Sequence, residues 1–327
     1  MANFELLAKS TSAFKIISED KRAGKLSHAY LVINEDSENS GEYLKVLAKL
    51  ICCDDYENGV YGRFSKLIDS NSHPDVLFFP REKQSVTVED VSNLIEQSYV
   101  KPIESEKKVF VINYGESMSA TVQNKLLKTL EEPPKNVIIL IGAVSEYSLL
   151  ETIKSRAKKL RIGGFSSELL LSALSGELEE TEDIKGLIAS SDGTVRGVLN
   201  LAKDEELLKA KDLVVSVITE MKSSKDVLFF SNKIALSLVD EAKFITLLSG
   251  ALLDLLAGLE GKENLVKDRY VYTRVKNCEG FNRGSLIYAL EKTIEAEKRR
   301  KFNVKGAPLI EWLLFALLEG KYKWQKL

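Results

Sequence analysis

The sequence predicts an α/β fold: a parallel sheet with flanking helices, followed by a small helical domain and an all-α C-terminal domain. Two short β-branched runs, Lys108–Ile112 and Val137–Ile141, have the composition of strands buried on both faces of a parallel sheet. An amphipathic helix with Ser119 as its N-cap lies between them, so the three elements form a right-handed βαβ unit. From Asp204 onward the pattern is helical throughout.

The helix between the two runs has a single apolar stripe. Its apolar residues are spaced i, i+4, i+5 and i+8, which places them on the face that packs on the sheet: Val122, Leu126, Leu127 and Leu130. Pro133-Pro134 then ends the helix, because a proline excludes the preceding residue from the helical region.

The other elements of the N-terminal half follow in order. Residues 4–22 predict one amphipathic helix, with an expected buried side made of Phe4, Leu7, Phe14, Ile16 and Ile17. The pattern further predicts a first strand over 26–33, a helix over 43–52, a second strand over Val76–Phe79 and a helix that ends at Tyr99.

The C-terminal half is expected to be helical. Gly163-Gly164 marks a hinge, and two or three short helices are expected between Phe165 and Leu201. Leucine-rich stripes then predict longer helices over residues 207–221, 225–238, 243–259, 283–298 and 305–318. We therefore expect three domains, which span 1–163, 164–203 and 204–327.

Composition limits the possible classes of function. With 327 residues, the chain is long enough for two or three domains. A net charge of −2 argues against a protein that grips nucleic acid over a broad basic face by itself. The three cysteines, Cys52, Cys53 and Cys278, include no CxxC pair, and we expect a reduced, cytoplasmic protein. The N-terminus lacks the pattern of a signal peptide, and no unbroken apolar run of about 18 residues predicts a membrane span.

Two strings add a specific family likeness. Asn124–Pro134, NKLLKTLEEPP, and Thr152–Arg156, TIKSR, resemble the AAA+ module of bacterial replicative clamp loaders. The HAYL of residues 28–31 and the HPD of residues 73–75 extend the resemblance. An amphipathic helix alone would be the simpler explanation, but eleven consecutive matching positions argue against chance. The resemblance implies that the three domains are, in order, an AAA+ core, a helical lid and an oligomerisation collar.

The residues after the first strand depart from the family's nucleotide-binding loop. In the family's register, Ser40 stands where the phosphate-binding lysine belongs and Gly41 where the magnesium-binding Ser or Thr belongs. The loop, which starts at Asn34, also carries carboxylates expected to point into a site built for a polyanion: Glu35, Asp36 and Glu38. Because these like charges repel phosphate, we do not expect tight nucleotide binding.

By the same resemblance, two further parts of the ATPase site are missing. Asn113 and Tyr114 occupy the positions of the acidic pair that holds magnesium and activates water, and neither supplies a charge or a base near neutral pH. The family's polar sensor would fall at Ala143 or Val144, both apolar. Arg196 matches the second sensor arginine, and without a P-loop we expect it to form a structural salt bridge or a helix N-terminal contact.

One functional residue of the family is retained, the arginine of Ser155-Arg156-Ala157. The resemblance implies that Arg156 reaches into the ATP site of a neighbouring subunit and stabilises charge on the γ-phosphate. Arginine suits this role because its planar guanidinium is always charged and binds phosphate through two hydrogen bonds. The alternative is that Arg156 only belongs to a solvated basic run with Lys154, Lys158, Lys159 and Arg161.

Other candidate ligands have structural explanations. Many relatives carry a four-cysteine zinc module near residues 54–72, but the adjacent Cys52 and Cys53 do not provide a tetrahedral site. His28 is expected to be a structural hydrogen-bonding residue, and His73 a turn residue beside a proline. No metal and no cofactor is predicted.

Direct contact with DNA is not expected of this chain. The resemblance places Ser92 where relatives carry an arginine used on the DNA backbone. A basic cluster at residues 298–301 lies at a predicted helix end, where the helix dipole favours cations.

These losses resemble the delta-prime class of DNA polymerase III clamp-loader subunits, which implies a chain that does no chemistry of its own. The implied partners are gamma/tau-like ATPase subunits and a delta-like subunit, with the sliding clamp and primer-template DNA reached through the complex. Two alternatives stay open. One is an active AAA+ motor ATPase, which would need a lysine in the loop, and the other is a scaffold that uses the AAA+ fold in another complex.

Overall fold

The computed structural model describes residues 2–54, 56, 62–81, 85–178, 181–237, 239–301 and 306–323. The chain divides into two compact units. The first, here called the sheet unit, comprises Met1–Glu177 and Gly193–Arg196, and the second, the helical unit, comprises Leu178–Asp192 and Gly197–Leu327. The three functional domains expected from the sequence stay a prediction.

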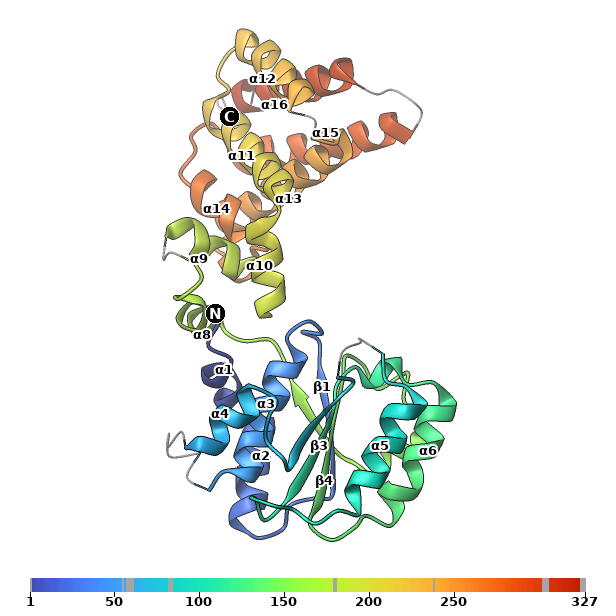
Figure 1. Ribbon diagram of the computed structural model, residues 1–327. Coiled ribbons are helices and arrows are strands. Elements are labelled where there is room, and N and C mark those ends of the chain that lie inside the picture. Colours follow the sequence, from blue (N-terminus) through green and yellow to red (C-terminus); the bar gives the residue numbers. More distant parts are fainter. Residues whose placement is uncertain are drawn as a thin grey trace. The chain divides into compact units, whose positions relative to one another are not determined.

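The sheet unit is built on a parallel sheet whose strand order, over the described residues, is β2-β3-β4-β1-β5 (Figure 1). The strands are β1 (Ala29–Asn34), β2 (Val76–Phe79), β3 (Lys108–Ile112), β4 (Val137–Ala143) and β5 (Lys158–Ile162). Every neighbouring pair is parallel, so the carboxyl ends of the strands meet at one edge of the sheet. This arrangement confirms the predicted α/β fold built on a parallel sheet.

The central strands are buried along their whole length. β1, β3 and β4 consist of buried residues only, which confirms that the β-branched runs form strands covered on both faces. β3, α6 (Ala120–Glu131) and β4 form the predicted strand, helix and strand, and the two strands are neighbours. Ser119 caps α6, because its side chain accepts a hydrogen bond from the Val122 N–H.

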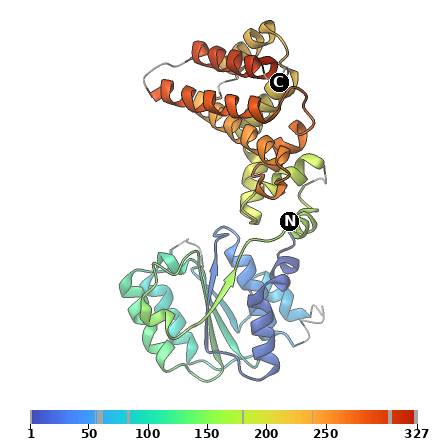
Figure 2. The same cartoon turned by 180° about the vertical axis from the view of Figure 1, so that it is seen from behind.

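Helices cover both faces of the sheet. α2 (Ser12–Arg22), α3 (Ser40–Cys52) and α4 (Arg63–Asp69) lie on one side, and α5 (Val88–Ser98) and α6 lie on the other (Figures 1 and 2). The apolar stripe of α6 packs as predicted, with three members buried in a cluster against the sheet and Leu127 partly buried beside them.

The N-terminal segment forms two helices, so the prediction of one helix over 4–22 is wrong. α1 (Phe4–Ser10) ends before Thr11, and α2 begins at the next residue. Thr11 is extended, and its side chain accepts a hydrogen bond from the Phe14 N–H, so it caps α2 and interrupts the helical path. Of the expected buried side, three residues are buried and two are half-buried: Leu7, Phe14 and Ile17, against Phe4 and Ile16.

The sequence pattern does not predict β5. Leu160 and Ile162 are buried, whereas the alternate residues Lys158, Lys159 and Arg161 are exposed. A charged edge strand of this kind discourages pairing with another chain, and its alternation looks like a plain basic run in the sequence. Two short helices, α4 and α7 (Glu151–Lys154), are likewise not predicted.

Helices make up the rest of the described chain. After the sheet come the expected short helices, α8 (Ser167–Leu174), α9 (Glu182–Ala189) and α10 (Val195–Lys203). The longer predicted helices follow with slightly shifted ends: α11 (Glu205–Glu220), α12 (Ser224–Leu236), α13 (Glu241–Leu259), α15 (Arg283–Lys301) and α16 (Ala307–Lys323). α14 (Arg269–Val275) and the 3-10 turns η2 (Gly115–Ser117) and η3 (Glu263–Leu265) are not predicted.

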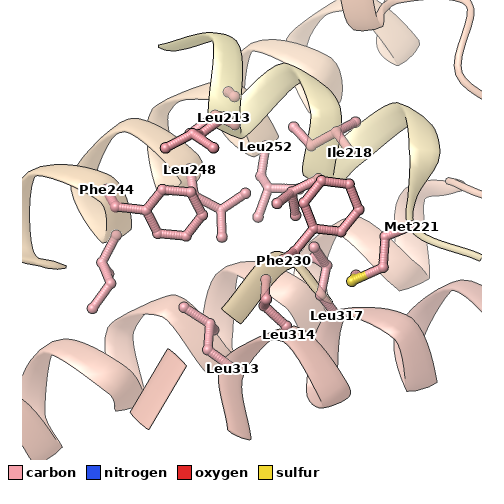
Figure 3. Packing of buried hydrophobic residues seen from close by; sticks show 14 of the residues in the cluster. Leu213, Ile218, Met221, Phe230, Phe244, Leu248, Leu252, Leu313, Leu314 and Leu317 are labelled. Carbon is pink, nitrogen blue, oxygen red and sulfur yellow. The ribbon is translucent and has the colours of Figure 1, made fainter. Parts of the chain in front are cut away.

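The helical unit has its own apolar core. α11, α12, α13 and α16 contribute buried side chains that meet in one cluster, among them Ile218, Phe230, Leu252 and Leu317 (Figure 3). This packing follows from the leucine-rich stripes seen in the sequence.

Among the described helices, α13 has the length and composition that would also suit a membrane span. An 18-residue window of it has a mean hydropathy of 1.6, and 39% of that window is buried. Phe244, Leu248 and Leu252 on its buried side belong to the core of the helical unit. A core helix meets the same criterion as a membrane span, so the hydropathy of α13 is weak evidence for a membrane.

Candidate functional site

The segment between β1 and α3 is the expected nucleotide loop, and its own side chains bond one another. Asn34 and Asp36 are 3% and 2% exposed. Asn34 Oδ1 accepts a hydrogen bond from the Asp36 N–H (3.0 Å), and Asp36 Oδ1 accepts one from Asn39 Nδ2 (2.9 Å). The other two acidic residues, Glu35 and Glu38, are exposed, and Glu38 Oε1 lies 3.0 Å from Arg196 Nε, so Asp36 is the one carboxylate of the three that is buried.

The start of α3 packs closely against the ends of the neighbouring strands. Ser40 is the first residue of α3 and is 4% exposed. A Cβ atom on Gly142, in β4, would lie 3.2 Å from Ser40 Oγ and 2.5 Å from Leu44 Cδ1. A Cβ atom on Gly41 would lie 3.3 Å from Asn113 Nδ2. The fold therefore brings together the start of α3 and the residue after β3, which the resemblance places in separate parts of an ATP site.

Arg196 binds this same loop. Its backbone N–H donates to Asp36 Oδ2 (3.3 Å), its Nη1 donates to Ser37 Oγ (2.7 Å), and its Nε lies 3.0 Å from Glu38 Oε1. Because Arg196 is the second residue of α10, the Asp36 carboxylate also lies at the N-terminus of that helix, where the dipole favours a negative charge. Both structural contacts expected of Arg196, the salt bridge and the helix N-terminal contact, are confirmed.

Neutral side chains follow β3 and end β4. Asn113 Oδ1 is buried and has no hydrogen-bond partner among the described residues. Tyr114 has a left-handed backbone conformation (φ 57°, ψ 44°). Ala143 is 2% exposed, and the next residue, Val144, donates its N–H to Glu116 Oε2 (3.1 Å). An amide and a phenol after β3 offer a metal no charge and a water molecule no base near neutral pH.

Arg156 lies on the turn after α7, and its guanidinium is held by its own chain. Nη2 lies 2.7 Å from Glu131 Oε1, at the end of α6. Nη1 donates to the Thr152 carbonyl oxygen (2.9 Å) and to Ser155 Oγ (3.3 Å). The side chain is 33% exposed. The guanidinium is thus held in one direction and is still accessible from solvent.

The lysines around Arg156 each have a partner of their own. They pair with carboxylates at 2.5–2.7 Å: Lys154 with Glu151, Lys158 with Asp20 and Lys159 with Glu146. The hydrogen bond from Lys159 also lowers the pKa of the Glu146 carboxyl. Each of these lysines thus belongs to a separate ion pair, and the Lys154, Lys158 and Lys159 side chains are 11%, 42% and 50% exposed.

The structure gives different outcomes for the structural roles expected of His73 and His28, and it describes Cys52 and Cys53 as free thiols. His73 is 3% exposed and accepts a hydrogen bond from the Asp75 N–H on Nδ1 (3.1 Å), which confirms its role in the turn, and burial lowers its pKa. His28 Nε2 is buried without a partner in the described part of the chain, so its expected hydrogen bond is not seen. Cys52 and Cys53 are buried free thiols whose pKa values are raised by burial. The described residues, which leave out part of the segment after Cys53, contain no group of three possible metal ligands.

Two positions considered for DNA contact are engaged within the chain. Ser92 Oγ accepts a hydrogen bond from Lys125 Nζ (2.5 Å), so α6 places a lysine beside the position of the lost arginine. In the cluster at 298–301, Arg299 pairs with Glu295 (2.6 Å), and its guanidinium carbon lies 3.9 Å from the ring centroid of Trp312. The contacts of Arg299 agree with a structural role at the end of α15.

Glu131 and Gln123 are two site residues that the sequence pattern does not predict. Gln123 is 2% exposed, its Nε2 donates to two backbone carbonyls (2.9 and 3.0 Å), and its Oε1 accepts from the Leu150 N–H (2.7 Å). It thereby fixes the segment that leads into α7 and Arg156. The available signals were a polar residue beside the apolar stripe of α6 and a carboxylate in the last turn of a helix.

Comparisons with known proteins agree with the resemblance seen in the motifs. A family model described as "DNA polymerase III, delta subunit" matches residues 9–166. The DNA polymerase III subunit delta' of Bacillus subtilis is 25% identical over 316 residues, which cover 94% of this chain and 95% of that protein. The DNA polymerase III subunit gamma of Buchnera aphidicola subsp. Schizaphis graminum is 25% identical over 215 residues, which cover 63% of this chain and 59% of that protein.

Solved structures also align with this chain. The Bacillus subtilis DNA clamp loader delta protein covers 94% of this chain and 99% of its own, with 12% sequence identity and a TM-score of 0.39. The strand order and parallel pairing described above establish the sheet.

Proposed function

We propose that this chain, whose residues 9–166 match a DNA polymerase III family model, is a non-catalytic, delta-prime-like clamp-loader subunit that supplies Arg156 in trans to the ATP site of a neighbouring subunit. In this role the chain takes part in loading the sliding clamp onto primer-template DNA, in the cytoplasm. One observation carries the proposal. The loop expected to bind nucleotide is bound by Arg196 of the same chain, whereas Arg156 of the same sheet unit is accessible from solvent.

The contacts of the nucleotide loop support the loss of ATPase activity. The Arg196 guanidinium is bound to Ser37 and Glu38 of its own chain, at 2.7 and 3.0 Å. The buried Asp36 carboxylate lies at the N-terminus of α10, where a bound anion would gain from the helix dipole. A nucleotide would have to displace these groups and approach a buried carboxylate, which costs free energy that a loop lysine would normally offset.

The setting of Arg156 supports a function outside its own chain. Its side chain is 33% exposed on a turn, where a neighbouring subunit can reach it. Its planar guanidinium can bind a phosphate bidentately while it remains fully charged. Arginine fingers of other nucleotide-hydrolysing proteins raise the rate by about 10³ to 10⁵.

The partners in this proposal are gamma/tau-like ATPase subunits and a delta-like subunit, with residues 204–327, which lie within the helical unit, as the oligomerisation collar. Apolar side chains stay exposed on that unit around a cavity of about 740 Å³ between α13 and α15. Its exposed members are Leu253, Leu265 and Ile287, which are 53%, 59% and 39% exposed. Exposed apolar area of this kind favours assembly with other subunits.

The test is the ATPase activity of a reconstituted loader that contains either the wild-type chain or Arg156→Ala, with clamp and primer-template DNA present. We expect single-turnover hydrolysis at the adjacent site to fall by about 10³ or more while assembly is unchanged. Arg161→Ala is the matched control, because Arg161 is an exposed arginine in the same basic run. Unchanged hydrolysis in Arg156→Ala would leave the chain as a scaffold, and micromolar binding of a fluorescent ATP analogue to the isolated chain would favour an active ATPase.

A further inference from the structure

Glu131 lies where a carboxylate is unfavourable unless a cation is beside it. It is the last residue of α6, where the helix dipole presents a negative partial charge, and Glu132 follows it as the C-cap. Helix formation alone therefore does not explain an acidic residue at this position. The contact that offsets the cost is the ion pair with Arg156, with 2.7 Å between Oε1 and Nη2.

The Arg156 guanidinium is bound by residues of two helices. Glu131, at the end of α6, binds Nη2, and the Thr152 carbonyl oxygen in α7 accepts a hydrogen bond from Nη1 (2.9 Å). A guanidinium has five N–H donors in a rigid fork, so it can keep these partners and bind a further anion at the same time. With 33% of the Arg156 side chain and 49% of the Glu131 side chain exposed, an approaching subunit can reach the pair.

We propose that Glu131 is a positioning residue for Arg156, which orients the guanidinium for the phosphate of a neighbour's nucleotide. This inference rests on the proposed function of Arg156. A free arginine side chain has many rotamers, and selecting one in advance removes part of the entropic cost of reaching a phosphate. An exposed ion pair shifts an equilibrium by about five-fold at most, so Glu131 is too weak to withhold Arg156 from a polyanion but strong enough to direct it.

The experiment measures kcat and KM for ATP of the reconstituted loader with Glu131→Ala, Glu131→Gln and the control Glu132→Gln. Glu132 is an exposed glutamate next to Glu131, so the control makes the same change of charge at the same helix end. We expect Glu131→Ala to lower kcat by about two- to five-fold with KM unchanged, and Glu131→Gln, which keeps an acceptor oxygen, to lower it less. Glu132→Gln should match the wild type.

The same substitutions in an Arg156→Ala background separate positioning from a merely structural role. A positioning residue acts only through Arg156, so Glu131→Ala should cause no further loss there. An equal loss in both backgrounds, or a wild-type kcat in Glu131→Ala, would overturn the inference. A rise in kcat would overturn it as well, because the carboxylate would then compete with phosphate. If Arg156→Ala itself leaves hydrolysis unchanged, the proposed function of Arg156 fails, which is a different result.

Discussion

Replacing Asp75 tests how much the His-Pro-Asp turn stabilises the segment that precedes β3. Asp75 has no exposed surface, and its carboxylate accepts hydrogen bonds from three successive backbone N–H groups, those of Ile103, Glu104 and Ser105, at 2.8, 2.7 and 2.8 Å. A hydrogen bond to a charged group contributes about 1.5–3 kcal/mol, and neighbouring bonds are less than additive. We therefore expect Asp75→Ala to lower the free energy of unfolding of the sheet unit by about 3–5 kcal/mol. Asp75→Asn should cost about 2–3 kcal/mol, because one acceptor oxygen becomes a donor that faces an N–H group.

Hydrogen exchange of the β2 and β3 amides during urea titration measures this change in the sheet unit. Trp312 lies in α16 of the helical unit, so its fluorescence, measured in a Trp324→Phe background, follows that unit separately and should not change. Glu106→Gln, which removes an exposed carboxylate from the same segment, is the matched control. If Asp75→Asn lowers the free energy of unfolding by less than about 1 kcal/mol, the three hydrogen bonds to the Asp75 carboxylate contribute little to stability, and the reasoning is refuted.

Two further substitutions test the sheet unit. Gly142→Ala would place a Cβ atom 2.5 Å from Leu44 Cδ1, so we expect the free energy of unfolding in urea to fall by about 1–3 kcal/mol. Gly163→Ala is the control, because a Cβ atom there meets nothing within 4 Å. Equal stability of the two variants would contradict the close packing around Gly142. Burial lowers the pKa of His73 below its ordinary value of 6.5, so His73 binds a proton more readily in the unfolded chain than in the folded one. The stability that neutral His73 contributes is therefore fully present above about pH 6.5 and is lost as the pH falls towards the folded-state pKa. Urea midpoints at pH 7.5 and 5.5 should differ less in His73→Asn than in the wild type, and an NMR titration of His73 at or above 6.5 would rule this out.

The parts of the fold that sequence reasoning predicted are those encoded by nearby residues. The bounds of β2 and β3 agree with the predicted runs, and Ser119 caps α6 as expected. These features depend on the period of apolar side chains and on one residue beside a helix end, which are visible within a few positions. The break at Thr11 is also local, but a threonine gives no clear signal because it is tolerated both within helices and at caps.

The candidate site is only partly readable in the same way. The absence of a lysine at Ser40 and the retention of Arg156 are facts of the sequence, and a resemblance in register is enough to notice them. The partners of these residues are not. Glu131 is 25 positions from Arg156, and Ser37 is 159 positions from Arg196, so only chain folding brings each pair together.

β5 shows the physical reason for this limit. In the sequence, Lys158, Lys159 and Arg161 look like a solvated basic run, because their charges mask the alternate apolar residues. In the folded chain, the strand pairs with β1, its two apolar side chains are buried, and Lys158 meets Asp20, 138 positions away. Local side-chain chemistry thus specifies which elements form, whereas the sheet edge and the ion pairs around Arg156 depend on contacts whose free energy exists only after distant segments have come together.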